Sequence, residues 1–271
     1  MPAPPPIAVA MLGLDPAQAG VGGLAPSGER VRAVLAWLSK SGARGVRIDA
    51  TTAGIRAREL DRSGRRDLGA LLRRTELTFA GADLFIPPEH FAKPDAADRA
   101  VSAVLGAIDL AADLSQLSSG AVVTRLISNS PSSVSVVLPT TLAPDMLAAI
   151  TDHATSRGVL LANHAWPIQD SVADVEQPIG IGLDPATAFA SGADPVSIAA
   201  QLGKRLVCAR LSDLAGSNTI GASRVVPGSG RLDLNAYFAT LSTIGYETHA
   251  ILDLTGLRDP VQAITQVQHI D

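Results

Sequence analysis

Short apolar runs alternate along the chain with longer stretches in which apolar residues recur every three to four positions. The short runs have the length of β-strands, and the longer stretches have the period of amphipathic helices. The pattern predicts strands at 7–14, 46–50, 77–86, 121–127, 159–163, 179–184, 206–211 and 250–254. It predicts helices at 29–40, 65–75, 95–114, 144–156, 195–202, 235–244 and 260–269, with a short helix near 172–176. This order is typical of β/α units around a parallel sheet.

Eight strands with intervening helices fit a closed (β/α)8 TIM barrel, and the chain length of 271 residues fits the same fold. No linker separates two regimes of composition, so we predict a single barrel domain over residues 1–271. A doubly wound open sheet is the alternative, but no Gly-x-Gly-x-x-Gly motif follows the first predicted strand. The alternation does not need one further apolar run, 134–138, which could be a hairpin arm or an active-site flap.

Composition narrows the class of protein. Hydrophobic residues make up 46% of the chain, charged residues 18%, and the formal net charge is −4, as in soluble globular proteins. The acidic balance argues against a nucleic-acid partner. The only cysteine, Cys208, lies in an apolar run, and the amino terminus lacks the basic region of a signal peptide. We expect a cytoplasmic protein without a membrane partner, and its oligomeric state is left open.

In a TIM barrel the active site lies at the carboxyl ends of the strands, so polar residues that end apolar runs are the candidates for chemistry. His164 follows the fifth predicted strand and Asp184 ends the sixth, while Arg210 and Asp253 lie near the ends of the seventh and eighth. We predict these four as candidate catalytic residues at one rim. Each of them alone could equally cap a helix or pair with a neighbouring charge.

A second group of residues is predicted to bind substrate. The glycine-rich loop over 226–233, with Gly228 and Gly230, follows the seventh strand, where barrels often bind phosphate; it could equally be a turn that positions the next helix. Arginine side chains at the barrel mouth would favour an anionic ligand such as a sugar phosphate or sugar acid. The predicted substrate-binding residues are Arg47, His90, Asp213, Gly228, Gly230 and Arg231. His90 could instead be an exposed loop residue.

Several segments together resemble the xylose isomerase-like TIM barrels, the sugar phosphate isomerase/epimerase superfamily. The resemblance lies in 158–164, 179–184, 210–213, 228–233 and 245–253, and upstream in 41–48. It implies a small-molecule carbohydrate ligand. It also implies a divalent metal held by a Glu ending strand five, an Asp ending strand six, the His of a His-x-x-Asp on strand seven and a Glu ending strand eight.

The resemblance is incomplete at those metal positions. The strand-five Glu corresponds to His164, or to Ala162 in a shifted register, and the strand-eight Glu is shortened to Asp253. Asp184 keeps its carboxylate. Arg210 replaces the strand-seven His, although Asp213 retains the following Asp, and Thr187 stands where a further His is expected.

Arginine at position 210 changes the expected chemistry, because a guanidinium is always charged and has no lone pair for a metal. We expect Arg210 to lie between Asp184 and Asp253 and to replace the charge of the metal. Alternatively, His164, Asp184 and Asp253 hold Zn or Mn if Arg210 swings away.

The leading hypothesis is therefore an isomerase/epimerase-like protein with an altered metal site. The competing one is a carbohydrate-binding pseudoenzyme without proton transfer. An endonuclease of the same superfamily is disfavoured by the missing ligands and by the acidic charge.

Overall fold

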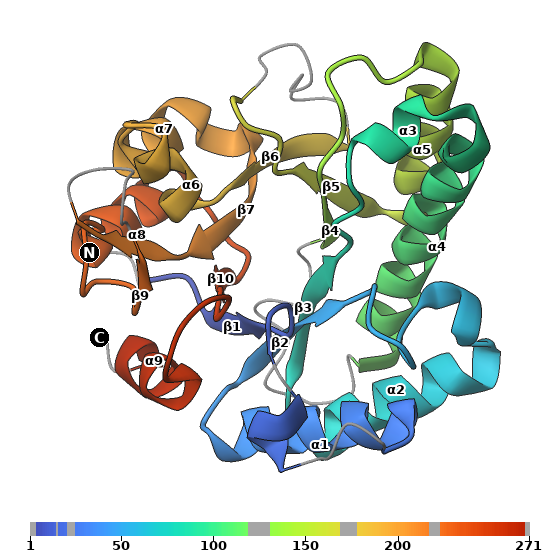
Figure 1. Ribbon diagram of the computed structural model, residues 1–271, viewed down its shortest axis with the longest axis horizontal. Coiled ribbons are helices and arrows are strands. Elements are labelled where there is room, and N and C mark those ends of the chain that lie inside the picture. Colours follow the sequence, from blue (N-terminus) through green and yellow to red (C-terminus); the bar gives the residue numbers. More distant parts are fainter. Residues whose placement is uncertain are drawn as a thin grey trace.

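The computed structural model describes residues 4–14, 16–20, 25–118, 131–168, 178–216 and 223–268. Eight parallel strands close into a barrel, in the order β1, β2, β3, β4, β5, β6, β7 and β10 (Figure 1). These strands are β1 Ile7–Ala10, β2 Gly45–Asp49, β3 Thr78–Asp83, β4 Ser132–Val136, β5 Val159–Asn163, β6 Ile179–Leu183, β7 Leu206–Leu211 and β10 Ala250–Leu252. The predicted (β/α)8 barrel is confirmed.

The helices surround the strands (Figure 1). The α-helices are α1 Ser27–Lys40, α2 Arg62–Arg74, α3 Glu89–Ala92, α4 Pro94–Ser118, α5 Pro144–Arg157, α6 Pro185–Ala190, α7 Pro195–Leu202, α8 Leu234–Thr243 and α9 Pro260–Gln268. Short 3-10 helices are η1 Pro16–Ala19, η2 Ala57–Glu59 and η5 Gly203–Arg205. Outside the barrel, β8 Asp213–Ala215 and β9 Ser223–Val225 pair antiparallel after β7.

The apolar run at 134–138 is neither a hairpin arm nor a flap, because it contributes to β4, the fourth strand of the barrel. Val134 pairs with Ala82 of β3 on one side and with Leu161 of β5 on the other. Ser133 and Ser135 face the barrel interior, whereas Val134 and Val136 face outward. Because of the serines, the full strand does not stand out in the sequence as an apolar run. The predicted strand at 121–127 and the predicted helix at 172–176 lie outside the described residues.

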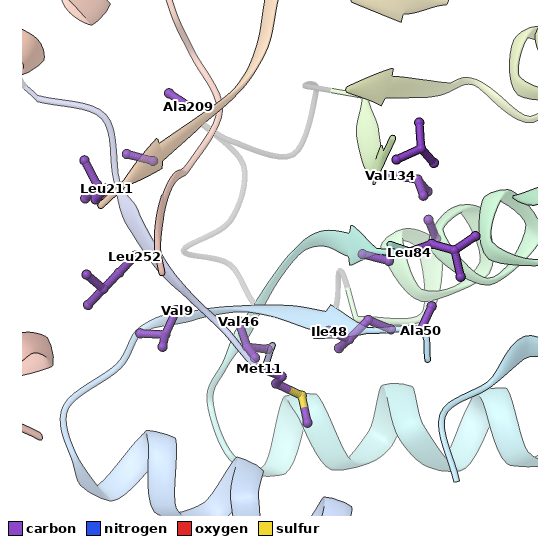
Figure 2. Packing of buried hydrophobic residues seen from close by; sticks show 14 of the residues in the cluster. Val9, Met11, Val46, Ile48, Ala50, Leu84, Val134, Ala209, Leu211 and Leu252 are labelled. Atoms are coloured by element: carbon purple, nitrogen blue, oxygen red, sulfur yellow. The ribbon is translucent and has the colours of Figure 1, made fainter. Parts of the chain in front are cut away.

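The core lies mainly between the strands and the helices. Outward-facing residues such as Val9, Val46 and Leu252 pack against the helical layer (Figure 2). The barrel interior holds a separate small cluster, made of Ala8, Ala10, Ala162, Cys208 and Ile251. Because most of these interior side chains are small, the barrel has room for two fully buried arginine side chains, which are the largest buried side chains of the described structure.

α4 is long and apolar enough to cross a membrane by length and composition alone. Its apolar residues, including Val104, Ile108 and Leu114, are buried in the main core cluster, and the helix contacts β3, β4, α2 and α5. In this fold α4 is therefore a core helix of the barrel layer.

Candidate functional site

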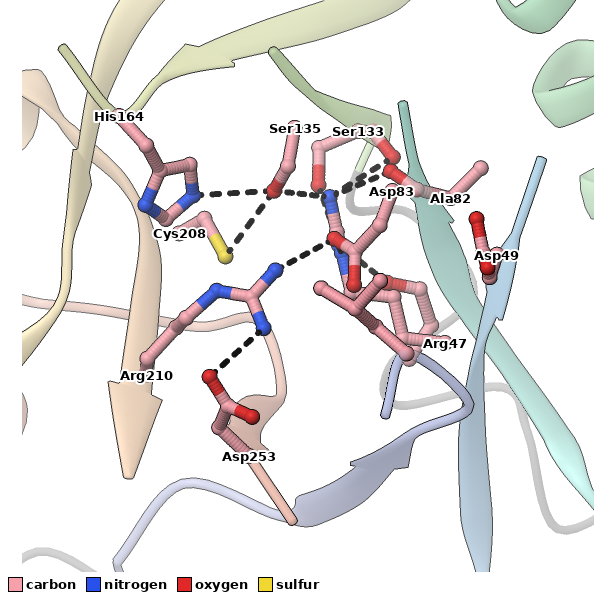
Figure 3. Close-up of polar contacts among 12 residues, drawn as sticks. Arg47, Asp49, Ala82, Asp83, Ser133, Ser135, His164, Cys208, Arg210 and Asp253 are labelled. Atoms are coloured by element: carbon pink, nitrogen blue, oxygen red, sulfur yellow. Dashed lines mark hydrogen bonds and ion pairs between the residues drawn. The ribbon is translucent and has the colours of Figure 1, made fainter. Parts of the chain in front are cut away.

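The polar centre of the barrel begins with Arg47 on β2 and Asp83 at the end of β3 (Figure 3). Arg47 Nε donates to Asp83 Oδ1 at 2.6 Å, and the two side chains are 1% and 0% exposed. Burying a charge is costly unless it is paired and fully hydrogen-bonded. The other nitrogens of Arg47 meet this requirement by donating to the Ala80, Ala82 and Ser133 carbonyls and to the Ser133 and Ser135 hydroxyls.

A β-bulge in β3 makes this approach possible. The pairing of β2 with β3 shifts between Val46 and Ile48, so β3 has an extra residue there. Gly81 lies in the bulge with φ of +107°, a conformation that favours glycine. A Cβ at this position would collide with the Arg47 guanidinium and with the Ser133 carbonyl. The glycine thus lets β3 turn two carbonyl groups toward Arg47.

Arg210 on β7 reaches the same carboxylate from the other side of the barrel. Arg210 Nη2 donates to Asp83 Oδ1 at 2.6 Å, and Nη1 lies 3.6 Å from Asp253 Oδ2 (Figure 3). The guanidinium also stacks over the ring of Phe85, 5.2 Å from its centroid. The expectation that Arg210 pairs with both Asp184 and Asp253 is therefore wrong for Asp184. Asp83 takes that place because it lies deep enough in the barrel to meet the arginine.

A different arginine, Arg224, holds Asp184. Strand β9 carries Arg224 to the rim, where Nη2 donates to Asp184 Oδ2 at 2.9 Å and Nη1 donates to Asp253 Oδ2 at 3.0 Å. Asp184 is the N-cap of α6, accepting from Ala186 N, and it also accepts from the hydroxyls of Ser212 and Thr187. A single guanidinium thus links the ends of β6 and β10.

These contacts form a continuous alternating row, which we call the guanidinium–carboxylate chain: Arg47, Asp83, Arg210, Asp253, Arg224 and Asp184. It runs from the barrel interior to the rim, where Arg224 is 26% and Asp184 17% exposed. Burial alone would raise the pKa of Asp83, but Arg210 and Arg47 outweigh it and lower that pKa to about 2. Burial would lower the pKa of Arg210, but Asp83 and Asp253 raise it.

The outer members of the chain are shifted in the same directions. Burial opposes the ionisation of Asp184, but the charge of Arg224 and the hydrogen bond from Ser212 lower its pKa. Burial likewise opposes the charge of Arg224, but Asp184 and Asp253 raise its pKa. All four shifts favour the charged forms, so Asp83, Arg210, Asp184 and Arg224 remain ionised at neutral pH.

His164 lies directly beyond β5 and beside the guanidinium–carboxylate chain. Its Nε2 is 3.0 Å from the hydroxyl of Ser135, and its ring meets Phe85 edge-to-face with centroids 5.7 Å apart. A Cβ on Gly182 of β6 would collide with the ring, so glycine is needed there. Burial and the nearby charge of Arg210 lower the pKa of His164 to about 3. The imidazole is therefore neutral at physiological pH.

The strand-five Glu of the family corresponds to either Ala162 or His164. These two residues lie on the same face of the strand, because residues two apart share a face. Ala162 lies deeper, in the small interior cluster with Cys208. His164 lies at the carboxyl end and contacts the polar centre through Ser135. His164 is thus the β5 side chain available at the rim.

The glycine-rich loop is organised by Asp213 of β8. The two carboxylate oxygens of Asp213 accept hydrogen bonds from the backbone amides of Leu214, Gly228, Gly230, Arg231 and Leu232. The loop amides thus have an intramolecular partner, as expected for a turn that positions α8. The Arg231 side chain points to α6, where it donates to the Phe189 carbonyl and stacks 4.5 Å from that ring's centroid.

Of the other predicted site residues, His90 lies half-buried in the short helix α3 and is not among the described residues that contact the guanidinium–carboxylate chain. Sequence reasoning missed Asp83 because the third strand was extended to residue 86, which placed this aspartate inside the strand instead of at its end. It also missed Arg224. Asp184 and Asp253 need a positive partner, and this need could have indicated an arginine in the segment that follows β7.

In this structure the predicted metal ligands have other partners. The predicted ligand set was His164, Asp184 and Asp253. Both aspartates already accept hydrogen bonds from Arg224, and His164 Nε2 contacts Ser135. Within the described part of the chain, no group of three His, Cys, Asp or Glu side chains is arranged to hold a metal ion. A cation placed here would be repelled by two guanidinium groups.

Solved structures share this architecture. A xylose isomerase-like TIM barrel protein from Mycobacterium smegmatis, solved in complex with magnesium, has a TM-score of 0.68 and 14% identity, covering 96% of this chain and 93% of that one. The 3-keto-D-glucoside 4-epimerase YcjR from E. coli has a TM-score of 0.63 and 14% identity, covering 97% of each chain. A D-psicose 3-epimerase, solved in the presence of D-fructose, has a TM-score of 0.58 and 14% identity, covering 85% of this chain and 80% of that one.

At such identities, these likenesses concern the fold alone. A comparison with curated protein sequences finds no match. A family model described as "Xylose isomerase-like TIM barrel" matches residues 35–269, which is most of the chain. The match agrees with the closed barrel and with the resemblance seen in the sequence. The chain belongs to the xylose isomerase-like TIM barrel family.

Proposed function

We propose that this protein is a sugar phosphate isomerase/epimerase-like protein that binds a sugar, sugar phosphate or sugar acid at the carboxyl-terminal rim of the barrel. In this proposal, guanidinium groups replace the divalent metal of the site. One observation carries the proposal: Arg210 and Arg224 are paired with the carboxylates of Asp83, Asp253 and Asp184, with the closest N–O distances between 2.6 and 3.0 Å. Arg210 and Arg224 thus supply the positive charge that a metal would otherwise supply.

Carbohydrate recognition needs fixed donors and acceptors beside one another, because each sugar hydroxyl both donates and accepts. The rim supplies them in alternating order through Arg224, Asp184 and Asp253. Aromatic surface is close by in Phe85, which contacts both Arg210 and His164. Arg224 lies in β9, and Asp184 and Asp253 directly follow β6 and β10, so these groups are positioned before a ligand arrives.

The bound sugar could be held without proton transfer or be isomerised, and His164 favours binding without proton transfer. A general base works well when its pKa lies near the working pH. His164, whose pKa is lowered to about 3, is a weak base. Isomerase or epimerase chemistry is a second candidate, and the position of Arg210 favours it. A guanidinium can stabilise negative charge on a substrate oxygen while a neighbouring group removes a proton from the adjacent carbon.

The test measures binding and proton exchange in the same sample. Saturation-transfer NMR with D-fructose, its phosphate monoester and D-gluconate is recorded in heavy water with a chelator present. We expect at least one of these compounds to bind with the chelator present and no deuterium to enter its carbon-bound positions. Deuterium incorporation would favour the isomerase, and binding that needs added Zn or Mn would contradict replacement of the metal.

A pair of variants shows where the ligand binds. Arg224→Gln removes the charge that links Asp184 and Asp253 and should weaken binding. Arg44→Gln is the matched control, because Arg44 is exposed and directly precedes β2, at the opposite end of the barrel. Equal effects of the two substitutions would contradict a site at the carboxyl-terminal rim.

We propose that residues 1–271 act as one domain in the cytoplasm, with a small-molecule ligand and without a nucleic-acid or membrane partner. The single cysteine, Cys208, is a free thiol, and the lack of an intrachain disulfide supports a reducing compartment.

A further inference from the structure

We propose that a second ligand site lies on the outside of the barrel, in a hollow between α2 and α4. Its ligand is a small molecule that carries a phosphate group beside an apolar portion. The two helices pack against each other in the helical layer (Figure 1). The hollow has a volume of about 480 Å³, within the usual range of small-molecule pockets. Its lining contains no member of the guanidinium–carboxylate chain, so this inference is independent of the function proposed above.

Three arginines of the lining stand at the beginning of α2, where a helix disfavours positive charge. Arg62 is the first residue of α2, Arg65 and Arg66 follow it, and the first turn contains no acidic residue. The peptide dipoles already place partial positive charge at this end. Arg62 and Arg66 also lie one turn apart, a spacing at which like charges repel. Arg73 and Arg74, by contrast, lie in the last turn, which the dipole favours for cations. A bound anion would remove both penalties at the first turn.

One of these arginines already has a carboxylate partner. Arg65 Nη1 donates to Asp113 Oδ2 of α4 at 2.5 Å. The other oxygen of Asp113 accepts from Nη2 of Arg157, on α5, at 2.7 Å. Two guanidinium groups thus share this one carboxylate, so Asp113 has little negative charge left to repel an anion in the hollow. The same pairing holds Arg65 at the edge of the hollow.

The other two arginines have no such partner. Within the part of the chain that the structure describes, the side chains of Arg62 and Arg66 form no hydrogen bond or ion pair, and both residues are exposed. Asp61, the remaining carboxylate of the lining, is the N-cap of α2 and accepts from the amide of Gly64 at 2.7 Å. Guanidinium groups bind phosphate through paired hydrogen bonds. Arg62 and Arg66 are therefore the groups that would hold the phosphate.

The walls of the hollow indicate the rest of the ligand. Leu60 and Leu117 are half-buried and line it, and Gln116 adds an amide that can donate a hydrogen bond. A Cβ on Gly69 would collide with the Leu117 side chain, so the two helices are in close contact there. Arg73 also donates to the Leu117 carbonyl, which fixes the end of α4 against α2. An apolar group attached to the phosphate would pack against the leucines. A hollow of this size suits a small molecule better than a protein surface.

The experiment compares phenyl phosphate with its two halves, inorganic phosphate and phenol, by calorimetry and ligand-observed NMR at low salt. We expect phenyl phosphate to bind at least about tenfold more tightly than either half, since it uses the arginines and the leucines together. Inorganic phosphate that binds as tightly as phenyl phosphate would overturn the apolar portion of the assignment. Absence of phenyl phosphate binding overturns the site. So does a poly-glutamate peptide that binds where phenyl phosphate does not, because it would indicate an acidic protein partner.

Variants of α2 locate the site. Arg62→Gln and Arg66→Gln should each weaken phenyl phosphate binding by about tenfold, because each removes a charged donor. Arg74→Gln, an exposed position in the last turn of the same helix, is the control with the same loss of charge, and it should change the affinity less than about twofold. Equal losses in the three variants would show general attraction to the helix and overturn the proposal.

Two further measurements separate this site from the rim and from a structural role. Arg224→Gln should leave phenyl phosphate binding unchanged, and a loss confined to that variant would place the ligand at the rim, which overturns this inference and leaves the proposed function standing. Arg66→Gln should not lower the urea midpoint, because the native charge is unfavourable at its place in α2. A lower midpoint would show that Arg66 serves the fold and would contradict the proposal.

Discussion

The guanidinium of Arg210 lies between two carboxylates of the barrel interior, and this position decides what chemistry the rim can support. Arginine cannot give up its charge or coordinate a metal. It can donate several hydrogen bonds in fixed directions, and here it donates to Asp83 and faces Asp253. One residue type thus changes a position expected to hold a metal ligand into part of a charge-paired network.

His164 is the residue whose titration should affect stability most clearly. Its folded-state pKa of about 3 lies below the ordinary value of 6.5, so the unfolded chain takes up the proton first. The resulting stability is complete above pH 6.5 and is lost as the pH falls toward 3. Within this window we expect a loss of about 1.4 kcal/mol per pH unit from His164 alone.

Urea denaturation of the native protein and of His164→Gln across this window measures that loss. The variant should lose stability less steeply, because it has no imidazole to protonate. His249, whose pKa burial lowers to about 4, is present in both proteins and so cancels in the comparison. Parallel stability curves would show that His164 titrates normally.

Particular residues show how far the site could be predicted. His164, Asp184, Arg210 and Asp253 were found because each lies at or near the end of an apolar run, and these positions depend only on local pattern. Their partners were not found. Asp83 was hidden by a strand boundary drawn three residues too far. Arg224 lies on a short strand outside the barrel, and only folding carries it over β6 and β10.

Strands β8 and β9 are the element that builds the outer part of the site. This antiparallel pair begins with Asp213, which holds the glycine-rich loop, and ends just after Arg224, which links two barrel strands. Its position therefore depends on buried hydrogen bonds to one carboxylate. β4 shows the same dependence on context, since Ser133 and Ser135 make it a poor apolar strand but good hydrogen-bond partners for Arg47.

Asp213→Ala should remove the partner of five backbone amides. We expect a loss of about 2–4 kcal/mol of unfolding free energy, because buried donors left unsatisfied are costly. Asp233→Asn is the control, since asparagine also caps helices well and α8 should keep its first turn. Urea denaturation measures both losses. If the two variants are equally stable, Asp213 does not hold the loop.

At the scale of the whole molecule, closure of the barrel brings the charges together. The guanidinium–carboxylate chain crosses the barrel interior from β2 and β3 to β7 and β10 (Figure 3). Its members therefore come from the first and the last third of the sequence. Small interior residues such as Ala8 and Ala162 leave the volume that Arg47 and Arg210 fill. Buried ion pairs add little net stability, because the cost of removing the charges from water offsets their attraction.

This arrangement predicts how a metal site could be restored. Arg210→His alone should not create Zn affinity, because Arg224 still links Asp184 and Asp253. Adding Arg224→Ala frees both carboxylates, and the double variant should bind Zn with the new imidazole as a third ligand. Calorimetry with Zn and elemental analysis after dialysis measure the affinity and stoichiometry. Zn binding by the single variant would show that Arg224 does not block the site.

The sequence by itself determined the alternation of strands and helices, the barrel class and four residues of the rim, because these depend on period and on the ends of apolar runs. The tertiary structure alone decided which charges meet. Arg210 and Asp83 lie 127 positions apart, and Arg224 and Asp184 lie 40 apart. Local pattern carries no information about such pairings. They are set by strand register, by the bulge in β3 and by the path of β9, which together place each guanidinium beside its carboxylate.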